Sequence, residues 1–315
     1  MKPIHLIHHP DCRLHDTGGY HPERPERTQV IVEAFKAATF ARPIVWELAT
    51  PSELSWIEKV HDGHYIRRIE ELCLRGETAL DRGDTQVSDE SFDVARLAAG
   101  AAMQTVDCVL RASAHAAFSV MRPPGHHAEV AEAMGFCLFN NIAIAARYAQ
   151  QAYDLKRVAI IDIDVHHGNG TQAIFYEDPS VLFVSFHQFP FYPGTGSSIE
   201  RGRGLGDGAT LNIPLTAGAK FDEYESAWHD QVLPKLLSFE PEMILISAGF
   251  DAHKDDPLAN MLLKTSDFLQ LTRLIGGFAE QSCGGRVVSI LEGGYNLKAL
   301  AASCVAHVDG LCGIE

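Results

Sequence analysis

The sequence lacks any apolar run long enough to cross a membrane. Its first residues, MKPIHLIHHPD, turn polar at once, so we expect no signal-peptide core either. Basic residues are also few, since 26 Lys and Arg stand against 41 Asp and Glu, for a formal net charge of −15. Sequence-independent nucleic-acid binding needs a basic surface. We therefore expect neither a membrane nor a nucleic acid as a partner.

The pattern of the cysteines argues against a disulfide framework. The seven cysteines are an odd number and include no Cys-x-x-Cys pair, which favours reduced thiols and a cytoplasmic protein. The sequence also lacks internal repeats, low-complexity tracts and linkers, so we expect a single domain over residues 1–315. The oligomeric state stays open, and a homo-oligomer is compatible with the sequence.

Short apolar runs alternate with segments of helical spacing along the chain. This alternation predicts an α/β fold with a mainly parallel sheet and helices on both faces. The Gly-rich segment 190–207 does not lead from a strand into a helix, which excludes a phosphate loop. Predicted strands cover 116–120, 158–161, 181–186, 242–248 and 287–291, and predicted helices cover 28–38, 54–60, 63–74, 92–110, 140–153, 171–176, 221–237, 266–279 and 297–311.

The segment 158–170, VAIIDIDVHHGNG, carries the densest group of metal-binding and proton-moving side chains. Asp162, Asp164 and His166 follow the apolar run at a spacing of two, which on an extended chain points all three to one face. Ile163 and Val165 would then point into the packed interior. Two neighbouring buried carboxylates are costly unless a cation compensates them. Oxygen and nitrogen ligands of this kind suit zinc, iron, cobalt or manganese.

Polar side chains follow three other predicted strands. His126 and His127 stand side by side after 116–120, Asp251 follows 242–248, and Tyr295 follows 287–291 on a Gly-Gly turn that we expect to be flexible. Because the carboxyl ends of parallel strands share one edge of a sheet, these groups can converge on one site.

Asp164, His166 and Asp251 would make a three-ligand site with one open position, the pattern of a catalytic metal. Either histidine of the adjacent pair could take a proton from water and return it to a leaving amine. Tyr295 could donate to the developing oxyanion. The residues therefore predict metal-assisted hydrolysis of an amide. Glu23, Arg24 and Arg27, in contrast, are interpreted from the residues alone as a surface ion-pair cluster.

Five motifs together resemble the histone deacetylase family, and more narrowly its class II branch and the bacterial deacetylase-like amidohydrolases. They are RPPGHH at 122–127, MGFCLFNN at 134–141, DIDVHHGNGTQ at 162–172, SAGFDAHKDDPL at 247–258 and LEGGYN at 291–296. The resemblance runs from about His21 to the C-terminus. It implies the arginase–deacetylase fold, an eight-stranded mainly parallel sheet in a three-layer α/β/α sandwich. It also implies Zn²⁺ held by Asp164, His166 and Asp251, and removal of an acetyl group from an acylated amine.

The resemblance also assigns roles around the histidine pair. It makes His127 the general base and acid, and His126 its electrostatic partner, oriented by Asp162. Asn169 stands where some members have Asp, and a neutral amide leaves His127 more readily neutral. Tyr295 matches the tyrosine of active members. A structural K⁺ is implied as well, held by Asp162, Ser185 and backbone carbonyls near Asp164, His166 and Phe186.

Further residues are implied around the substrate. Gly135 would offer its carbonyl to the substrate amide, and Phe136 and Tyr192 would flank the acyl-lysine tunnel, where Tyr192 replaces the usual Phe. Asp84, within a polar segment at 77–91, would grip the substrate at the rim. Arg27 matches the arginine of the acetate exit path, and Leu258 stands at the gatekeeper position.

The identity of the substrate stays open at this point. A leucine at 258 favours acyl-lysine or a similar N-acetyl amide, whereas polyamine-selective members have Glu there. An acetylpolyamine amidohydrolase is nevertheless the main alternative, because acids elsewhere could set the pocket. A dimanganese ureohydrolase would need an acid where His253 stands, and a non-catalytic acyl-amine binding protein would need neither the histidine pair nor Tyr295. The acyl group, and zinc or iron as the metal, are also left open.

Overall fold

The computed structural model describes residues 1–81 and 84–313. Within these ranges eight strands form one sheet in the order β2-β1-β3-β8-β7-β4-β5-β6, and every neighbouring pair is parallel. The predicted mainly parallel α/β fold is thus confirmed. The strands are β1 Ile4–His8, β2 Ile44–Leu48, β3 Ala116–Ser119, β4 Val158–Asp162, β5 Val181–Gln188, β6 Thr210–Leu215, β7 Met243–Ala248 and β8 Val287–Leu291.

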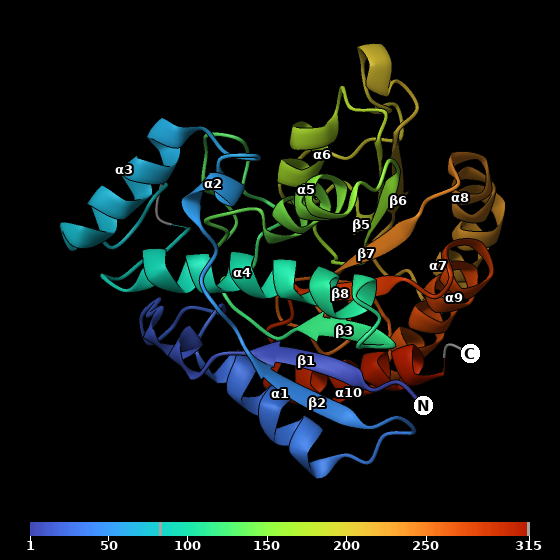
Figure 1. Ribbon diagram of the computed structural model, residues 1–315, viewed down its shortest axis with the longest axis horizontal. Coiled ribbons are helices and arrows are strands. Elements are labelled where there is room, and N and C mark those ends of the chain that lie inside the picture. Colours follow the sequence, from blue (N-terminus) through green and yellow to red (C-terminus); the bar gives the residue numbers. More distant parts are fainter. Residues whose placement is uncertain (82–83, 314–315) are drawn as a thin grey trace.

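Helices cover both faces of this sheet (Figure 1). One apolar core lies between the sheet and α1, α7, α8, α9 and α10, and a second lies between the opposite face and α2 to α6. The three layers of the expected sandwich are therefore present. The helices are α1 Glu26–Ala37, α2 Leu54–Ile57, α3 Gly63–Leu74, α4 Ser91–Leu110, α5 Asn141–Tyr153, α6 Asn169–Phe175, α7 Phe221–Ala227, α8 Leu233–Phe239, α9 Thr265–Cys283 and α10 Leu297–Cys312.

The central strands are apolar on both faces, which explains their continuous hydrophobic runs. Along β4, Ala159 and Ile161 enter one core, whereas Val158 and Ile160 enter the other. This alternation follows from the two-residue period of a strand. None of the described helices combines the length and apolar character needed to cross a bilayer.

Three strands, β1 and the two edge strands β2 and β6, fall outside the strands that the pattern predicts. Every residue of β2 is partly or fully exposed, and β6 is only half buried, so neither has the fully buried apolar run of a central strand. The single helix predicted over 221–237 is also wrong in detail, because a π-helical turn at Trp228–Val232 separates α7 from α8.

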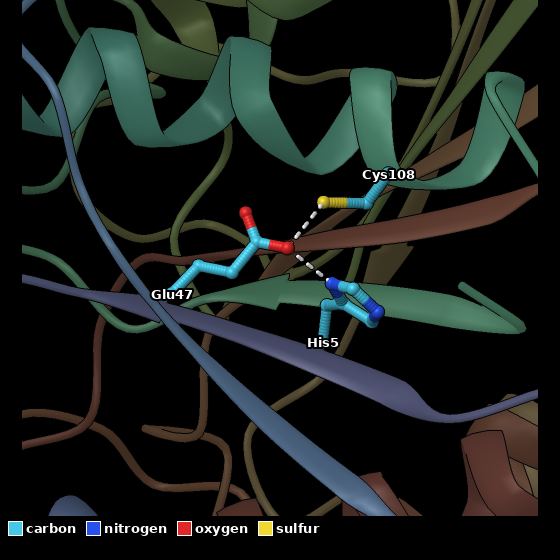
Figure 2. A group of neighbouring side chains, drawn as sticks. All are labelled: His5, Glu47 and Cys108. Atoms are coloured by element: carbon cyan, nitrogen blue, oxygen red, sulfur yellow. Dashed lines mark hydrogen bonds and ion pairs between the residues drawn. The ribbon is translucent and has the colours of Figure 1, made fainter. Parts of the chain in front are cut away.

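A small polar cluster interrupts the second core near the sheet edge. His5 of β1, Glu47 of β2 and Cys108 of α4 point toward one another there (Figure 2). The carboxylate of Glu47 accepts hydrogen bonds from both the imidazole and the thiol.

The strands β3, β8, β7 and β4 are four adjacent strands in the middle of the sheet. They are also the strands whose carboxyl ends precede the predicted polar groups. The topology therefore brings these groups to one edge of the sheet, where sites in parallel α/β folds are found.

Candidate active site

Asp164, His166 and Asp251 do converge. The Nδ1 atom of His166 lies 3.2 Å from Oδ1 of Asp164 and 3.1 Å from Oδ2 of Asp251. All three side chains are buried, and one ligand atom from each lies within 4.8 Å of the others. The predicted ligand set is therefore assembled in one place.

The predicted extended course through this segment is wrong, because β4 ends at Asp162. The backbone N–H of Asp164 donates to Oδ1 of Asp162 at 3.1 Å, and that of His166 donates to Oδ1 of Asp164 at 2.9 Å. Carboxylates that bond the backbone two residues on bend the chain into successive turns. As a result Asp162 turns to His126, away from the three-ligand group.

The three-ligand group fits a divalent cation. The backbone N–H of Val165 donates to Oδ1 of Asp251 at 2.9 Å, and the backbone N–H of Gly293 donates to Oδ2 of Asp164 at 2.8 Å. A Cβ at position 293 would lie 2.2 Å from Oδ2 of Asp251, so only glycine permits this approach. Burial, and then the Asp164 carboxylate, raise the pKa of Asp251 to about 7. A cation would relieve this repulsion, and two carboxylates with one imidazole suit Zn²⁺.

The adjacent histidines differ in charge because their partners differ. Nδ1 of His126 donates to Oδ2 of Asp162 at 2.9 Å. Burial disfavours the charged form of His126, but the charges of Asp162 and Asp164 outweigh burial and raise its pKa to about 10. Burial, and then the charges of His126 and His166, hold the pKa of His127 well below its usual value. At neutral pH the pair therefore combines a charged and a neutral imidazole.

Asn169 fixes the tautomer of His127. Its Nδ2 donates to Oε1 of Glu129 at 2.8 Å, so its Oδ1 accepts from Nδ1 of His127 at 2.7 Å. The proton of the neutral ring is thereby held on Nδ1, which leaves Nε2 as the basic nitrogen. Glu129 was not identified from the sequence, although it lies only two residues after His127.

A buried glutamate supports the histidine loop. One oxygen of Glu292 accepts from the backbone N–H groups of Gly125 and His126, at 2.6 and 3.1 Å, and the other accepts from the Ser247 hydroxyl at 3.0 Å. Burial is the main cause that raises the pKa of Glu292 to about 7. This residue was also missed, and its place directly after β8 was the available signal.

The turn that carries Tyr295 is held in place, so the expectation of a flexible turn is wrong. Oδ2 of Asp256 accepts from the backbone N–H groups of Tyr295 and Asn296, at 2.7 and 3.2 Å. The guanidinium of Arg27 lies 5.0 Å from the centre of the Tyr295 ring and donates to the carbonyl of Gly294 at 2.7 Å. Asp256 was not singled out from the sequence, although it lies in one of the quoted motifs.

A cavity of about 210 Å³ opens onto these groups. Its walls bring together residues expected at the tunnel, the metal and the rim. Gly135 has a φ of +56°, and a Cβ there would lie 2.3 Å from the His127 ring, so glycine is needed. Phe191, which the sequence analysis missed, stacks on His166 with centroids 5.6 Å apart, whereas Tyr192 meets both His127 and His166 edge-on. The lining comprises Asp84, His127, Gly135, Phe136, His166, Phe191, Tyr192, Leu258 and Tyr295.

Asp84 lies at this cavity, as predicted for a rim residue, and hydrogen-bonds the Tyr192 hydroxyl. Burial, and then Asp81, raise its pKa. Asp81 itself serves the loop, because its carboxylate accepts from the backbone of Asp84 and Thr85 at 2.8 and 2.9 Å. Of these two acids, Asp84 is the one that lines the cavity.

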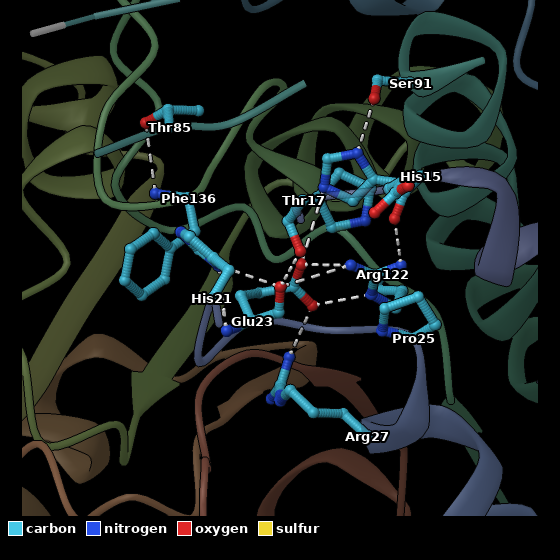
Figure 3. Close-up of polar contacts among 12 residues, drawn as sticks. His15, Thr17, His21, Glu23, Pro25, Arg27, Thr85, Ser91, Arg122 and Phe136 are labelled. Carbon is cyan, nitrogen blue, oxygen red and sulfur yellow. Dashed lines mark hydrogen bonds and ion pairs between the residues drawn. The ribbon is translucent and has the colours of Figure 1, made fainter. Parts of the chain in front are cut away.

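The surface interpretation of Glu23 and Arg27 is wrong, because both are fully buried (Figure 3). Glu23 lies between two buried guanidinium groups, 2.6 Å from Nη2 of Arg122 and 3.1 Å from Nη1 of Arg27. Only Arg24 of the three stays near the surface, where it pairs with Glu26. A buried carboxylate that bridges two arginines positions Arg27 against the Tyr295 turn.

The group expected around K⁺ lies behind the histidine pair. Asp162 pairs in register with Ser185 of β5, and both are fully buried. The Ser185 hydroxyl lies 2.9 Å from Nδ1 of His187, and Phe186 follows it in the strand. The residues named for this ion are thus neighbours.

Two further histidines turn away from the three-ligand group. His167 contacts Thr195 and Gln172 through its two ring nitrogens, at 2.8 and 3.0 Å. His253 contacts Thr265 and the backbone of Asp255. Among the described residues, no further metal-ligand group adjoins Asp164, His166 and Asp251. Neither His167 nor His253 is therefore part of the three-ligand group.

Comparison with known proteins agrees with this geometry. The model of the histone deacetylase domain matches residues 21–311. Histone deacetylase 14, chloroplastic, of Arabidopsis thaliana is 40% identical over 99% of this chain and 78% of its own length. The histone deacetylase-like amidohydrolase of Pseudomonas aeruginosa is 38% identical over 94% and 78%. The crystal structure of the HDA15 HD domain superposes with a TM-score of 0.93, at 35% identity over 99% of this chain and 90% of that one. The chain therefore has the arginase–deacetylase fold and belongs to the histone deacetylase family of deacetylases and amidohydrolases.

Proposed function

We propose that the protein is a zinc-dependent amidohydrolase that removes an acetyl or other short acyl group from an acylated amine such as acetyl-lysine. The observation that carries the proposal is the meeting of Asp164, His166 and Asp251 with His127 and a narrow cavity. A bound Zn²⁺ would polarise the substrate carbonyl and acidify water at this place. Residues 1–315 are proposed to form one catalytic domain.

The chain's own groups divide the remaining tasks. His127 is neutral, and its Nδ1 is bonded to Asn169, so its Nε2 carries no proton. This nitrogen takes a proton from water and passes it to the leaving amine. His126, held charged by Asp162, supplies positive charge beside the reacting carbonyl. Burial raises the pKa of the Tyr295 hydroxyl well above its usual value, so this group stays protonated and donates a hydrogen bond to the developing oxyanion.

The cavity supports an acyl-lysine or similar substrate. Phe136 and Tyr192 flank the entrance with aromatic rings, and Leu258 adds an apolar side chain. Gly135 presents its backbone beside His127, where it can accept from the amide of the substrate. Asp84 would bind the substrate backbone at the rim. Arg27, against the Tyr295 turn, is kept as a residue of the acetate exit path.

Two further proposals concern ions and compartment. K⁺ is proposed between β4 and β5, where it would link Asp162, Ser185 and backbone carbonyls near Asp164, His166 and Phe186. A reducing compartment, the cytoplasm, is proposed because all seven cysteines are free thiols.

The test is amine release from an acetyl-lysine peptide and from N-acetylputrescine, measured in parallel. Protein stripped by a chelator is expected to be inactive, and the first equivalent of Zn²⁺ is expected to restore turnover because it fills the three-ligand group. Asp251→Asn, which removes one negative ligand, should lose both the tightly bound ion and the turnover. Zinc-loaded protein that releases neither amine would contradict the proposal and favour another amide substrate or a binding protein.

An acetylpolyamine amidohydrolase is the second candidate, because Asp84 places a carboxylate at the cavity where a second ammonium could bind. Preference for N-acetylputrescine in the same assay would establish it.

Leu258→Glu is expected to shift the ratio of kcat/KM toward N-acetylputrescine by about five-fold. A new carboxylate at the half-exposed entrance attracts the free ammonium with roughly 1 kcal/mol. The measurement is kcat/KM for both substrates at two salt concentrations, since such attraction weakens in salt. Leu205→Glu, at a strongly exposed leucine outside the cavity, is the control. An equal shift in both variants would show that overall charge, and not position 258, sets the preference.

A further inference from the structure

The polar cluster of His5, Glu47 and Cys108 lies away from the site described above, where α4 packs on the edge of the sheet (Figure 2). In the register of β1 and β2, His5 pairs with Val45 and Ile7 pairs with Glu47. Partner residues of parallel strands share a face. His5 and Glu47 therefore point to the same face, and Cys108 approaches it from the last turn of α4.

The surroundings of the cluster are otherwise apolar. Ile7 and Ala117 of the sheet and Val109 of α4 belong to the core on this face. Three groups that commonly bind metals thus meet at an interface that aliphatic side chains would fill at lower cost. The cluster is still reachable from solvent, because the Glu47 side chain is 34% exposed while that of His5 is 9% exposed.

The three groups lie close enough together to share one ion, which would take the place of the hydrogen bond between His5 and Glu47. One ligand atom from each of His5, Glu47 and Cys108 lies within 4.8 Å of the other two. The distance from Sγ of Cys108 to Oε1 of Glu47 is 3.5 Å. Ligand atoms at the usual Zn–S and Zn–O distances on a tetrahedral ion lie roughly 3.5 Å apart. Imidazole, carboxylate and thiolate are also a donor set that zinc prefers.

We propose that His5, Glu47 and Cys108 form a second zinc site, with a fourth position open to water at the sheet edge. Binding replaces the thiol proton of Cys108, which leaves to solvent. The proton that His5 donates from Nδ1 to Glu47 is also displaced, and the neutral imidazole takes it up on Nε2 by exchange with water. The thiolate and the carboxylate then balance the two charges of the ion.

This site joins β1, the edge strand β2 and α4. Its effect is therefore structural: the ion ties the edge strand, whose residues are partly exposed, to the helix that covers it. Zn²⁺ beyond the first equivalent is expected to raise the thermal midpoint of the protein without changing its turnover.

Co²⁺ titration separates the two sites, because Asp164, His166 and Asp251 contain no sulfur. Wild-type protein is expected to bind two equivalents, and one of them produces the near-ultraviolet charge-transfer band of a cobalt thiolate. Cys108→Ser should lose the band, one equivalent and the added thermal stabilisation, yet keep the other equivalent and its activity. Glu47→Gln, which retains the thiol, should weaken binding of the second equivalent.

Cys312→Ser is the matched control, since Cys312 is a similarly buried cysteine near the end of α10. This variant should keep the band. A wild-type protein that binds one equivalent without the band would overturn the second site. So would a band that survives in Cys108→Ser or disappears in Cys312→Ser. Because activity reports the first site alone, failure of the second site leaves the proposed function untouched.

Discussion

Replacing His127 with alanine is expected to lower kcat for amine release by about 10²–10⁴-fold, the usual contribution of a positioned acid–base group. His127 lines the cavity beside His166, and Asn169 fixes its proton on Nδ1. The change removes no predicted metal ligand, so the protein should still bind its first equivalent of Zn²⁺. Steady-state kinetics together with metal analysis measure both expectations.

The dependence of turnover on pH tests the same assignment of His127 as the base. A base works in its unprotonated form, and the pKa of His127 is lowered from 6.5 by burial and by the charges of His126 and His166. Turnover should therefore persist at pH 6.5 and fall only as the pH drops further, through the lowered pKa of His127. His126, with a pKa raised to about 10, is protonated across this range and cannot be the base. An acidic limb centred above pH 6.5 would contradict the assignment.

His307→Ala provides the matched control. This imidazole is equally buried, but it bonds Thr272 and Ser289 at 2.6 and 2.8 Å, in the core beneath α10. Loss of a buried ring should destabilise both variants, whereas only His127→Ala should lose turnover per folded molecule. Comparable losses of kcat would mean that packing, and not proton transfer, explains the effect.

The parts of the fold and site that the sequence predicts well are those with a local signal. The strand β4 is apolar on both faces, so its run of Val158 to Ile161 stands out without any tertiary information. Asp251 and Tyr295 were found because they lie shortly after such strands, β7 and β8. The apolar run of the edge strand β2 covers only Ile44 to Trp46, and each residue of this strand is at least partly exposed.

Residues that act through distant partners could not be recognised in this way. Charged side chains are almost always exposed, so a local pattern assigns Glu23 and Arg27 to the surface. Their burial depends on Arg122, 99 positions from Glu23 in the chain. Glu292 and Asp256 likewise act by accepting hydrogen bonds from backbone N–H groups of other segments. Such contacts become visible only when the fold brings the segments together.

Glu23→Ala is expected to lower the free energy of unfolding by about 3–5 kcal/mol, the usual cost of removing one partner from a buried ion pair. The carboxylate is bidentate to Arg122, at 2.8 and 2.6 Å, and bonds Arg27 at 3.1 Å (Figure 3). Burial alone would raise its pKa, but Arg122, His15 and Arg27 hold it well below the usual value. The variant therefore leaves two guanidinium groups buried without their carboxylate.

The measurement is the free energy of unfolding in urea of Glu23→Ala, with Glu71→Ala as the exposed control. Glu71 pairs with Arg75 at 3.4 Å on the surface of α3, and exposed pairs of this kind contribute at most about 0.5 kcal/mol. Glu23→Gln, which keeps the shape but not the charge, should resemble Glu23→Ala if the charge is decisive. Equal stability of the Glu23 and Glu71 variants would show that water or another group compensates the arginines. Because Arg27 also contacts the Tyr295 turn, a loss of kcat in the folded Glu23 variant would connect this buried network to the site.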